Sequence, residues 1–405
     1  MLEKKCCICN DVLKINEYIV INNGKGICNS CMNNIACINK EINHNPVSFI
    51  NASENKKESN TYIEKTKPVE IKVQLDQYII GQEAAKKILA VATYNHLKRC
   101  EMNDAEIKKS NILLIGPTGS GKTYLVQILA KILNVPFVII QATSLTEAGY
   151  IGDDVEICVQ RLLENAGGDV ALAERGIIFI DEIDKLTATS SETKKQVGGK
   201  GVQQALLSLL DGIKVHVPLD TFSGKGKASM IEVDTTNILF ICGGAFPEAE
   251  SIIKKRLIGK NPVGFSSNLN PLGSVREDNL LLKVNNDDLK EFGLIPELLG
   301  RLPIIAPLEG VTIESLKRIL TEPRNSIVSQ YQRLFDYDSI KLNFEEEALE
   351  EIAVKAFSKG TGARSLRGIL EELLLNLMYE SPSKMELNEI FITKEYVHGE
   401  ADHAS

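Results

Sequence analysis

Gly116-Pro117-Thr118-Gly119-Ser120-Gly121-Lys122-Thr123 is the most informative stretch of this chain. It fits the pattern G-x-x-x-x-G-K-S/T without a gap, follows an apolar run at 111–115 that reads as a buried strand, and opens into 124–133, which has helical spacing. In this context the glycines let backbone N–H groups converge on phosphates, and the helix N-terminus adds partial positive charge. Lys122 is expected to reach the outer phosphates, and the Thr123 hydroxyl to ligate magnesium. We therefore interpret the stretch as an ATP site rather than as a glycine-rich turn without a ligand.

Length and composition limit the classes of protein to which the chain can belong. Its 405 residues suffice for two or three domains, and a content of 43% hydrophobic and 25% charged residues is ordinary for globular proteins. The net charge of -8, without a basic stripe, argues against a nucleic-acid or membrane-surface binder. The N-terminus lacks the apolar region of a signal peptide, and no apolar run approaches the roughly 20 residues that span a bilayer. We predict a cytoplasmic protein, from a bacterial cytosol or an organelle matrix.

Four of the nine cysteines have the spacing of a zinc site. Cys6-x2-Cys9 is followed after eighteen residues by Cys28-x2-Cys31, which lies within the window for four thiolates around one zinc ion. A segment as short as 1–45 is too small to fold on its own hydrophobic core and needs a bound metal ion to do so. Four protein ligands leave no open coordination position, so the metal should be structural. The alternative is a set of unrelated thiols, and Cys7 and Cys37 do not fit the spacing.

A second apolar run ends in two carboxylates about sixty residues after the phosphate loop. The run 177–180 is predicted to be a strand, and Asp181 and Glu182 follow it directly. This arrangement is called a Walker B motif. Asp181 would hold magnesium, because hard cations prefer oxygen ligands, and Glu182 would orient and polarise the attacking water. An acidic helix cap after a strand is the alternative for an isolated pair. Behind a matched phosphate loop, we favour the catalytic interpretation.

The pattern of apolar and breaker residues predicts five parts: a zinc-binding domain at 1–45, a flexible linker at 46–68, a large α/β ATPase domain at 69–310, a small, mostly helical domain at 311–395 and a tail at 396–405. The large domain is expected to hold a mostly parallel sheet flanked by helices, with further strands at 135–140, 237–242 and 302–305 and further helices at 83–98 and 153–165. Two segments, 187–201 and 217–233, are rich in Ser, Thr, Gly and Lys and are predicted to be exposed loops. The small domain is expected to contain helices at 312–334, 345–357 and 363–379 and a strand at 389–392.

Three further residues have an ordinary and a functional interpretation. Tyr150 lies between Gly149 and Gly152, where buried packing is favoured over a mobile loop that presents the ring to a substrate. Arg301 and Arg364 stand at a loop and at a predicted helix start, positions that suit the neutralisation of phosphate charge. Taken alone, each arginine is better explained as a surface salt-bridge residue.

Taken together, these motifs closely resemble the ClpX family of AAA+ unfoldases. The resemblance spans residues 6–380 and rests on the four-cysteine module and on the segments 75–82, 116–123, 147–153, 180–185, 201–207, 241–246, 300–303 and 361–364. It implies an AAA+ P-loop NTPase that requires ATP, Mg2+ and Zn2+, with Ile79 and Ile80 in the adenine pocket. It also implies that Arg301 is an arginine finger that enters the neighbouring subunit's site and that Arg364 is the sensor-2 arginine. Tyr150 and Ile151 would then lie on a pore loop that grips unfolded polypeptide.

The resemblance further implies partners. An arginine finger acts between subunits, so a homo-hexameric ring is expected, together with a ClpP-like peptidase ring, unfolded or tagged protein substrates and possible adaptors on the zinc module. The family's Ile-Gly-Phe docking tripeptide is represented here by Val263, Gly264 and Phe265. The family's basic pore-entrance loop is replaced by the segment 219–227, which has no Arg or His. Substrate-tag preference is therefore not predicted from the family.

The favoured function is that of an ATP-dependent unfoldase and translocase that feeds substrates to a peptidase and is not itself a peptidase. One alternative is an AAA+ nucleic-acid remodeller with a zinc finger, against which the charge argues. The other is a regulatory paralogue without a peptidase partner. A catalytically silent copy has no need of the full set of Lys122, Asp181, Glu182, Arg301 and Arg364.

Overall fold

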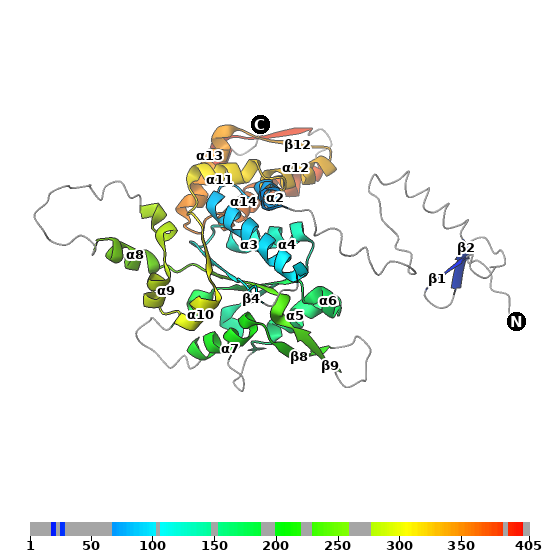
Figure 1. Ribbon diagram of the computed structural model, residues 1–405. Helices are drawn as coiled ribbons and strands as arrows, with labels where there is room; N and C mark the ends of the chain where they lie inside the picture. The colour runs from blue at the N-terminus through cyan, green and yellow to red at the C-terminus, as the bar shows by residue number, and fades with distance from the viewer. Residues whose placement is uncertain are drawn as a thin grey trace, which may run out of the picture. The chain divides into compact units, whose positions relative to one another are not determined.

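The computed structural model describes residues 18–21, 25–28, 67–102, 106–146, 153–187, 199–219, 229–258, 277–383 and 388–399 (Figure 1). The chain divides into two compact units, residues 1–62 and 63–405. In the first unit, β1 (Tyr18–Ile21) and β2 (Lys25–Cys28) form an antiparallel pair, with Tyr18 opposite Cys28. Of the predicted zinc ligands, only the backbone of Cys28 is described.

The second unit contains a parallel sheet of five strands. These are β3 (Ile112–Ile115), β4 (Phe137–Gln141), β7 (Ile177–Asp181), β10 (Leu239–Gly244) and β11 (Ile304–Pro307), in the spatial order β11-β3-β10-β7-β4. All pairs are parallel, and β10 lies between β3 and β7. The carboxyl ends of these three strands therefore meet at one edge of the sheet. The predicted α/β fold with a mostly parallel sheet is confirmed.

Each face of the sheet is covered by its own set of helices, because side chains alternate along a strand. Ile112 and Leu114 pack with residues of α2 (Pro68–Asp76), α3 (Glu83–Met102) and α4 (Lys122–Leu133). Leu113 and Ile115 pack against the opposite set, which includes α5 (Ile157–Asn165) and α7 (Gly199–Asp211). Figure 1 shows the sheet between these two layers. The same core extends to α8 (Ala249–Ile258), α9 (Asn286–Phe292) and α10 (Pro296–Arg301).

Several short elements complete this part of the chain. The sequence segment 217–233, predicted as an exposed loop, instead contributes to an antiparallel hairpin of β8 (Lys214–Leu219) and β9 (Ser229–Asp234). Val215 and Val217 are buried while His216 is exposed, so the strand has the alternation of a half-buried edge. The remaining short elements are η2 (Ala142–Ser144), β5 (Leu145–Thr146), β6 (Asp153–Asp154), α6 (Val170–Ala173), η3 (Ile183–Leu186), η4 (Thr235–Asn237) and η6 (Glu277–Lys283).

The C-terminal part is mostly helical and has its own hydrophobic core. The prediction of one helix at 312–334 was wrong, because the segment forms two helices, α11 (Ile313–Thr321) and α12 (Ile327–Tyr337). Pro323 cannot donate a helical hydrogen bond, and Ser326 caps the second helix by accepting a hydrogen bond from Ser329 N. The other elements are β12 (Lys341–Phe344), α13 (Glu346–Ser358), α14 (Arg364–Glu380), η7 (Ser381–Ser383), β13 (Glu389–Ile392) and α15 (Lys394–His398), with β12 and β13 paired in parallel.

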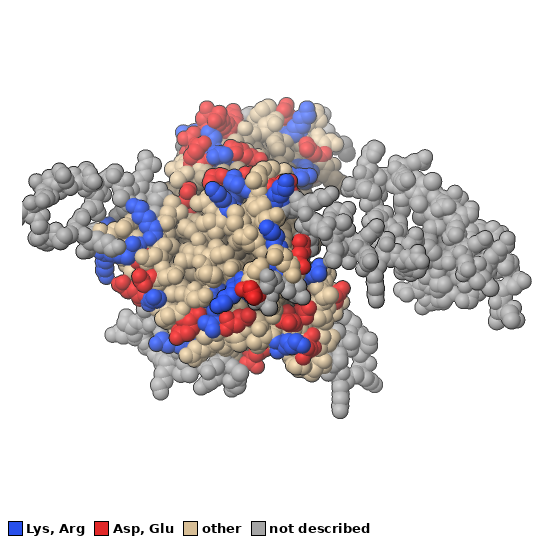
Figure 2. All heavy atoms as spheres, viewed as in Figure 1, with Lys and Arg blue, Asp and Glu red and all other residues tan. Residues whose placement is uncertain are grey.

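The surface and the helices bear on the class of protein. Figure 2 shows Lys and Arg side chains scattered among Asp and Glu, without a broad patch of one sign among the described residues on the face in view. None of the helices in the described ranges combines the length and the apolar character needed to cross a bilayer.

Candidate nucleotide-binding site

The phosphate loop connects β3 to α4 at the carboxyl edge of the sheet. Gly119 and Gly121 have φ angles of +79° and +91°, which lie in the region that glycine adopts without strain. Gly121 immediately precedes the first residue of α4, Lys122. The loop therefore ends at a helix N-terminus whose N–H groups point toward the loop, as an anion site requires.

Lys122 is held over the loop by main-chain oxygens. Its Nζ donates hydrogen bonds to Gly116 O at 2.6 Å and Pro117 O at 3.0 Å. Burial lowers the pKa of Lys122, while the carboxylates of Asp181 and Asp184 oppose that effect. The ammonium is thus confined to a position from which phosphate oxygens could accept its hydrogen bonds.

Thr123 and Asp181 meet across the sheet edge. Thr123 Oγ1 donates a hydrogen bond of 2.9 Å to Asp181 Oδ2, and the second carboxylate oxygen accepts the backbone N–H of Glu182 at 2.9 Å. Glu182 itself has a φ of +60°, a left-handed conformation that is uncommon for a residue other than glycine and is frequent at active sites. A hydroxyl and a carboxylate in contact form a hard oxygen donor set, which fits Mg2+.

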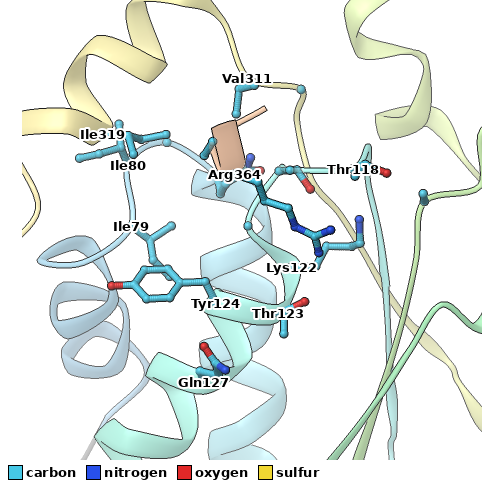
Figure 3. A pocket seen from close by; sticks show the side chains of 18 of the residues that line it. Ile79, Ile80, Thr118, Lys122, Thr123, Tyr124, Gln127, Val311, Ile319 and Arg364 are labelled. Atoms are coloured by element: carbon cyan, nitrogen blue, oxygen red, sulfur yellow. The ribbon is translucent and has the colours of Figure 1, made fainter. Parts of the chain in front are cut away.

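A cavity of about 880 Å³ brings most of the residues predicted for the nucleotide site together (Figure 3). Its lining includes the predicted adenine residues, the loop residues 118–123, both Walker B carboxylates and the predicted sensor-2 arginine: Ile79, Ile80, Thr118, Gly119, Ser120, Gly121, Lys122, Thr123, Asp181, Glu182 and Arg364. Lining residues also come from the helical part, including Ile319 and Ile327. The cavity has one apolar end and one charged end, the combination that a nucleotide requires.

Arg364 reaches this cavity because the start of α14 lies against the phosphate loop. Ala363 N donates a hydrogen bond of 3.3 Å to Gly119 O. The approach is so close that a Cβ added to Gly119 would lie 2.2 Å from Thr361 O. Figure 3 shows the Arg364 guanidinium beside the Lys122 side chain.

Arg301, in contrast, is not among the residues that line this cavity. It is the last residue of α10, and its Nε donates a hydrogen bond of 2.7 Å to Asp211 Oδ2 at the end of α7. Arg301 also donates a hydrogen bond from Nη1 to Glu297 O at 3.0 Å. The side chain is partly exposed, at 33%.

Sequence reasoning missed three groups that shape the site. Asp184 lines the cavity, is 4% exposed and accepts a hydrogen bond of 3.4 Å from Phe246 N. Its position three residues after Asp181, in Asp181-Glu182-Ile183-Asp184, could have indicated from the sequence that it belongs to the site. Lys86 is buried beneath the loop 78–82, where its Nζ contacts Asp76 and donates to Ile79 O at 3.3 Å. Gln82 donates a hydrogen bond to Glu309 O, in the segment that leads into the helical part. No local sequence pattern predicts that contact.

Other predicted functional residues lie outside the described ranges. They comprise the pore-loop pair, the docking tripeptide and three zinc ligands: Tyr150, Ile151, Val263, Gly264, Phe265, Cys6, Cys9 and Cys31. Within the described residues, no group of three or more His, Cys, Asp or Glu could hold a metal ion. Among the cysteines whose side chains are described, Cys100 and Cys242 are free thiols.

Comparison with known proteins covers most of the second unit. Residues 107–305 match the family model described as "AAA domain (Cdc48 subfamily)", and residues 311–393 match the "C-terminal, D2-small domain, of ClpB protein". The chain is 48% identical over 336 residues to the ATP-dependent Clp protease ATP-binding subunit ClpX of Treponema denticola. That match covers 82% of this chain and 81% of the relative.

Proposed function

The chain belongs to the ClpX family of AAA+ ATPases, the ATP-binding subunits of the ATP-dependent Clp protease, and from this premise we propose how its own residues carry out the activity. ATP binds in the cavity lined by the phosphate loop, Ile79, Ile80 and Arg364. Its hydrolysis drives the unfolding of protein substrates, which are passed to a ClpP-like peptidase. The chain contributes the ATPase and unfoldase activities and no peptidase activity.

One observation supports the assignment of nucleotide binding to these residues. A single cavity joins an apolar end, a helix N-terminus with a buried lysine, and the carboxylates of Asp181 and Glu182, the first of which accepts a hydrogen bond from Thr123. The apolar end suits a base, and the charged end suits a triphosphate. A nucleotide in that orientation would contact both the sheet and the helical part.

The chemistry follows from the positions of four side chains. Lys122 and Arg364 approach the phosphates and offset the negative charge that develops in the transition state. Glu182 orients the attacking water, while Asp181 and Thr123 would hold a magnesium ion. Bound magnesium would neutralise charge on the phosphate oxygens. Asp184 supports this edge through its hydrogen bond from Phe246 N.

Arg301 is proposed to act in trans, in a homo-hexameric ring. It is absent from the lining of the cavity in its own subunit, and Asp211 and Glu297 O already orient its guanidinium through Nε and Nη1. A partly exposed, oriented guanidinium suits a finger that completes a neighbouring site.

The remaining family features are proposed on the strength of the resemblance. We assign a structural zinc ion to Cys6, Cys9, Cys28 and Cys31 within a domain at 1–45, with adaptor binding on that module. Tyr150 and Ile151 would grip polypeptide, and Val263, Gly264 and Phe265 would dock the peptidase. We also propose the domain limits 46–68 for the linker, 69–310 and 311–395 for the two ATPase parts, and the bacterial cytoplasm as the location.

The alternative of a nucleic-acid remodeller is less well supported. Such proteins concentrate basic residues on one face, whereas acidic and basic side chains are interspersed on the face shown in Figure 2. The net charge of -8 agrees with that distribution.

The direct test combines the full chain with ATP, a tagged fluorescent protein and a ClpP-like peptidase. We expect fluorescence to fall only when ATP and the chain are both present. The Glu182→Gln variant should bind ATP and leave the fluorescence unchanged. ATP hydrolysis without any loss of fluorescence across several tags would contradict the unfoldase assignment.

A further inference from the structure

The Gln82 side chain joins two segments that lie far apart in the sequence. Its Nε2 donates a hydrogen bond of 2.9 Å to Glu309 O, and its Oε1 accepts a hydrogen bond of 2.8 Å from Glu309 N. One side-chain amide therefore satisfies both main-chain groups of one residue, as a neighbouring β-strand would. The residue is 8% exposed, so water competes little for these bonds.

The two segments have different roles in the site. Gln82 ends the loop 78–82, which carries the proposed base-binding residues Ile79 and Ile80. Glu309 belongs to the connection between β11, which ends at Pro307, and α11, which begins at Ile313. Gln82, Ile80, Glu309 and Val311 also line the same cavity. The amide thus joins the base-binding loop to the connection between the sheet and the helical part, residues 308–312, which we call the hinge.

Each side of this contact is anchored. On the loop side, Lys86 N donates to Gln82 O at 2.9 Å, and Lys86 Nζ donates to Ile79 O at 3.3 Å. On the hinge side, Leu308 N donates to Ile115 O at 2.6 Å, next to the phosphate loop. Both segments that Gln82 joins are therefore held in place by further hydrogen bonds.

The backbone of Gln82 is unusual for its residue type. Its φ is +59°, a region that favours glycine and costs other residues free energy. Glycine would satisfy the backbone at this position, but it would lack the amide. The side chain and the backbone conformation can therefore be tested separately by substitution.

We infer that Gln82 is a positioning residue that couples the base-binding loop to the hinge, so that a bound nucleotide fixes the angle between the sheet and the helical part that carries Arg364. This inference rests on the proposed nucleotide site. It adds the path by which contact with the base reaches Glu309, 227 residues along the chain.

The test compares three substitutions in the full chain. Gln82→Ala and Gln82→Gly both remove the amide, but only glycine relieves the backbone strain. Gln82→Glu retains the acceptor for Glu309 N and loses the donor to Glu309 O. We measure the Kd of ADP by calorimetry and hydrogen exchange of the amides at 308–311, with and without ADP.

In the parent, ADP should slow exchange at 308–311. Both Gln82→Ala and Gln82→Gly should bind ADP roughly tenfold more weakly, speed exchange at the Glu309 amide and lose the effect of ADP on the hinge. Gln82→Glu should retain partial protection of the Glu309 amide. The matched control is Gln332→Ala, because Gln332 Nε2 also donates to a main-chain oxygen, that of Leu342, but within the helical part. It should bind ADP like the parent.

Two outcomes would overturn the inference. One is ADP affinity within twofold of the parent in Gln82→Gly, which would show that the position matters only for its backbone. The other is hinge protection by ADP that survives in both Gln82→Ala and Gln82→Gly. Lys122→Ala separates this failure from failure of the proposed site: if Lys122→Ala also binds ADP normally, the nucleotide site itself is misassigned.

Discussion

Arg301 Nε lies 2.7 Å from Asp211 Oδ2, so that the last residue of α10 is held by the last residue of α7. The pair fixes one edge of the guanidinium, and Glu297 O fixes Nη1. The arginine is thereby oriented before any neighbouring subunit arrives, which reduces the entropy lost when it engages a phosphate. This preorganisation leads to the first prediction.

Arg301→Ala should lower the kcat of ATP hydrolysis by about 10³-fold or more while nucleotide affinity changes little, because the guanidinium acts on transition-state charge. Arg318→Ala is the matched control, since Arg318 pairs with Glu322 on the surface of α11. Co-assembly of Arg301→Ala and Lys122→Ala subunits, each inactive alone, should restore some hydrolysis. Mixed rings without activity would remove the support for action in trans.

Lys122→Ala and Glu182→Gln should fail in different ways. Loss of the Lys122 ammonium removes a contact with the phosphates and should weaken ATP binding. Glu182→Gln should leave ATP bound and unhydrolysed, because only the orientation of water is lost. Equilibrium binding of ATP and steady-state ATPase rates distinguish the two, and near-parental turnover by Glu182→Gln would show that another residue positions the water.

Gly362→Ala should disturb the contact between α14 and the phosphate loop. A Cβ at this position would lie 2.9 Å from Gly119 O, and the residue has a φ of +61°. Gly360→Ala is a close control: its φ is +67°, but its Cβ would meet nothing within 4 Å. Both variants should lose about 1 kcal/mol of stability from backbone strain, and only Gly362→Ala should lower the ATPase rate, by roughly tenfold. Equal ATPase rates would mean that the loop contact is not needed for catalysis.

His96 should make the fold sensitive to acid. It lies in α3, and Asn237 O is 3.1 Å from its Nε2; burial, together with the charges of Arg99 and Lys109, lowers its pKa to about 3. Between that value and the ordinary pKa of about 6.5, the unfolded chain binds the proton and the folded chain does not, so the free energy of unfolding falls as pH falls from 6.5 toward 3.

The measurement is urea unfolding of the parent and His96→Gln at pH 7 and pH 4.5. At pH 4.5 the cost attributable to His96 should be about 2 to 3 kcal/mol, and the variant should lose less stability on acidification than the parent by that amount. Parallel losses in the two proteins would show that His96 is protonated in the folded state.

The zinc module can be tested by metal content. Protein purified without chelators should hold one zinc ion per chain, and Cys28→Ser should hold less than half as much, because a structural site needs all four ligands. Cys242→Ser is a suitable control, since Cys242 is a buried free thiol in β10. Zinc-free parent protein would exclude the assignment.

Local signals were sufficient for the parts of the site that are local. The phosphate loop needs a strand, a turn and a helix in immediate succession, and 112–133 provide them in that order. The split between α11 and α12 was also readable, because Pro323 stands within the predicted helix. The β8–β9 hairpin was missed because the polar segment between its strands dominated the composition, although Val215 and Val217 alternate with polar neighbours.

Contacts between distant residues could not be predicted in this way. Gln82 and Glu309 are 227 residues apart, and Asp211 and Arg301 are 90 apart. Neither pair belongs to a periodic pattern, since each joins the ends of elements that become neighbours only in the folded chain. For such pairs, one sequence supplies candidate polar residues but not their partners.

The contact between Gly119 and the start of α14 also has a mechanical consequence. The helical part has its own core, so it can turn as one piece about its attachment. α14 contains 17 residues and is therefore roughly 25 Å long. A tilt of about 10° at its phosphate-loop end would move its far end by about 4 Å. The helix would thus act as a lever that amplifies a sub-ångström change beside Gly119. The resulting displacement is comparable to the rise of one residue in an extended polypeptide.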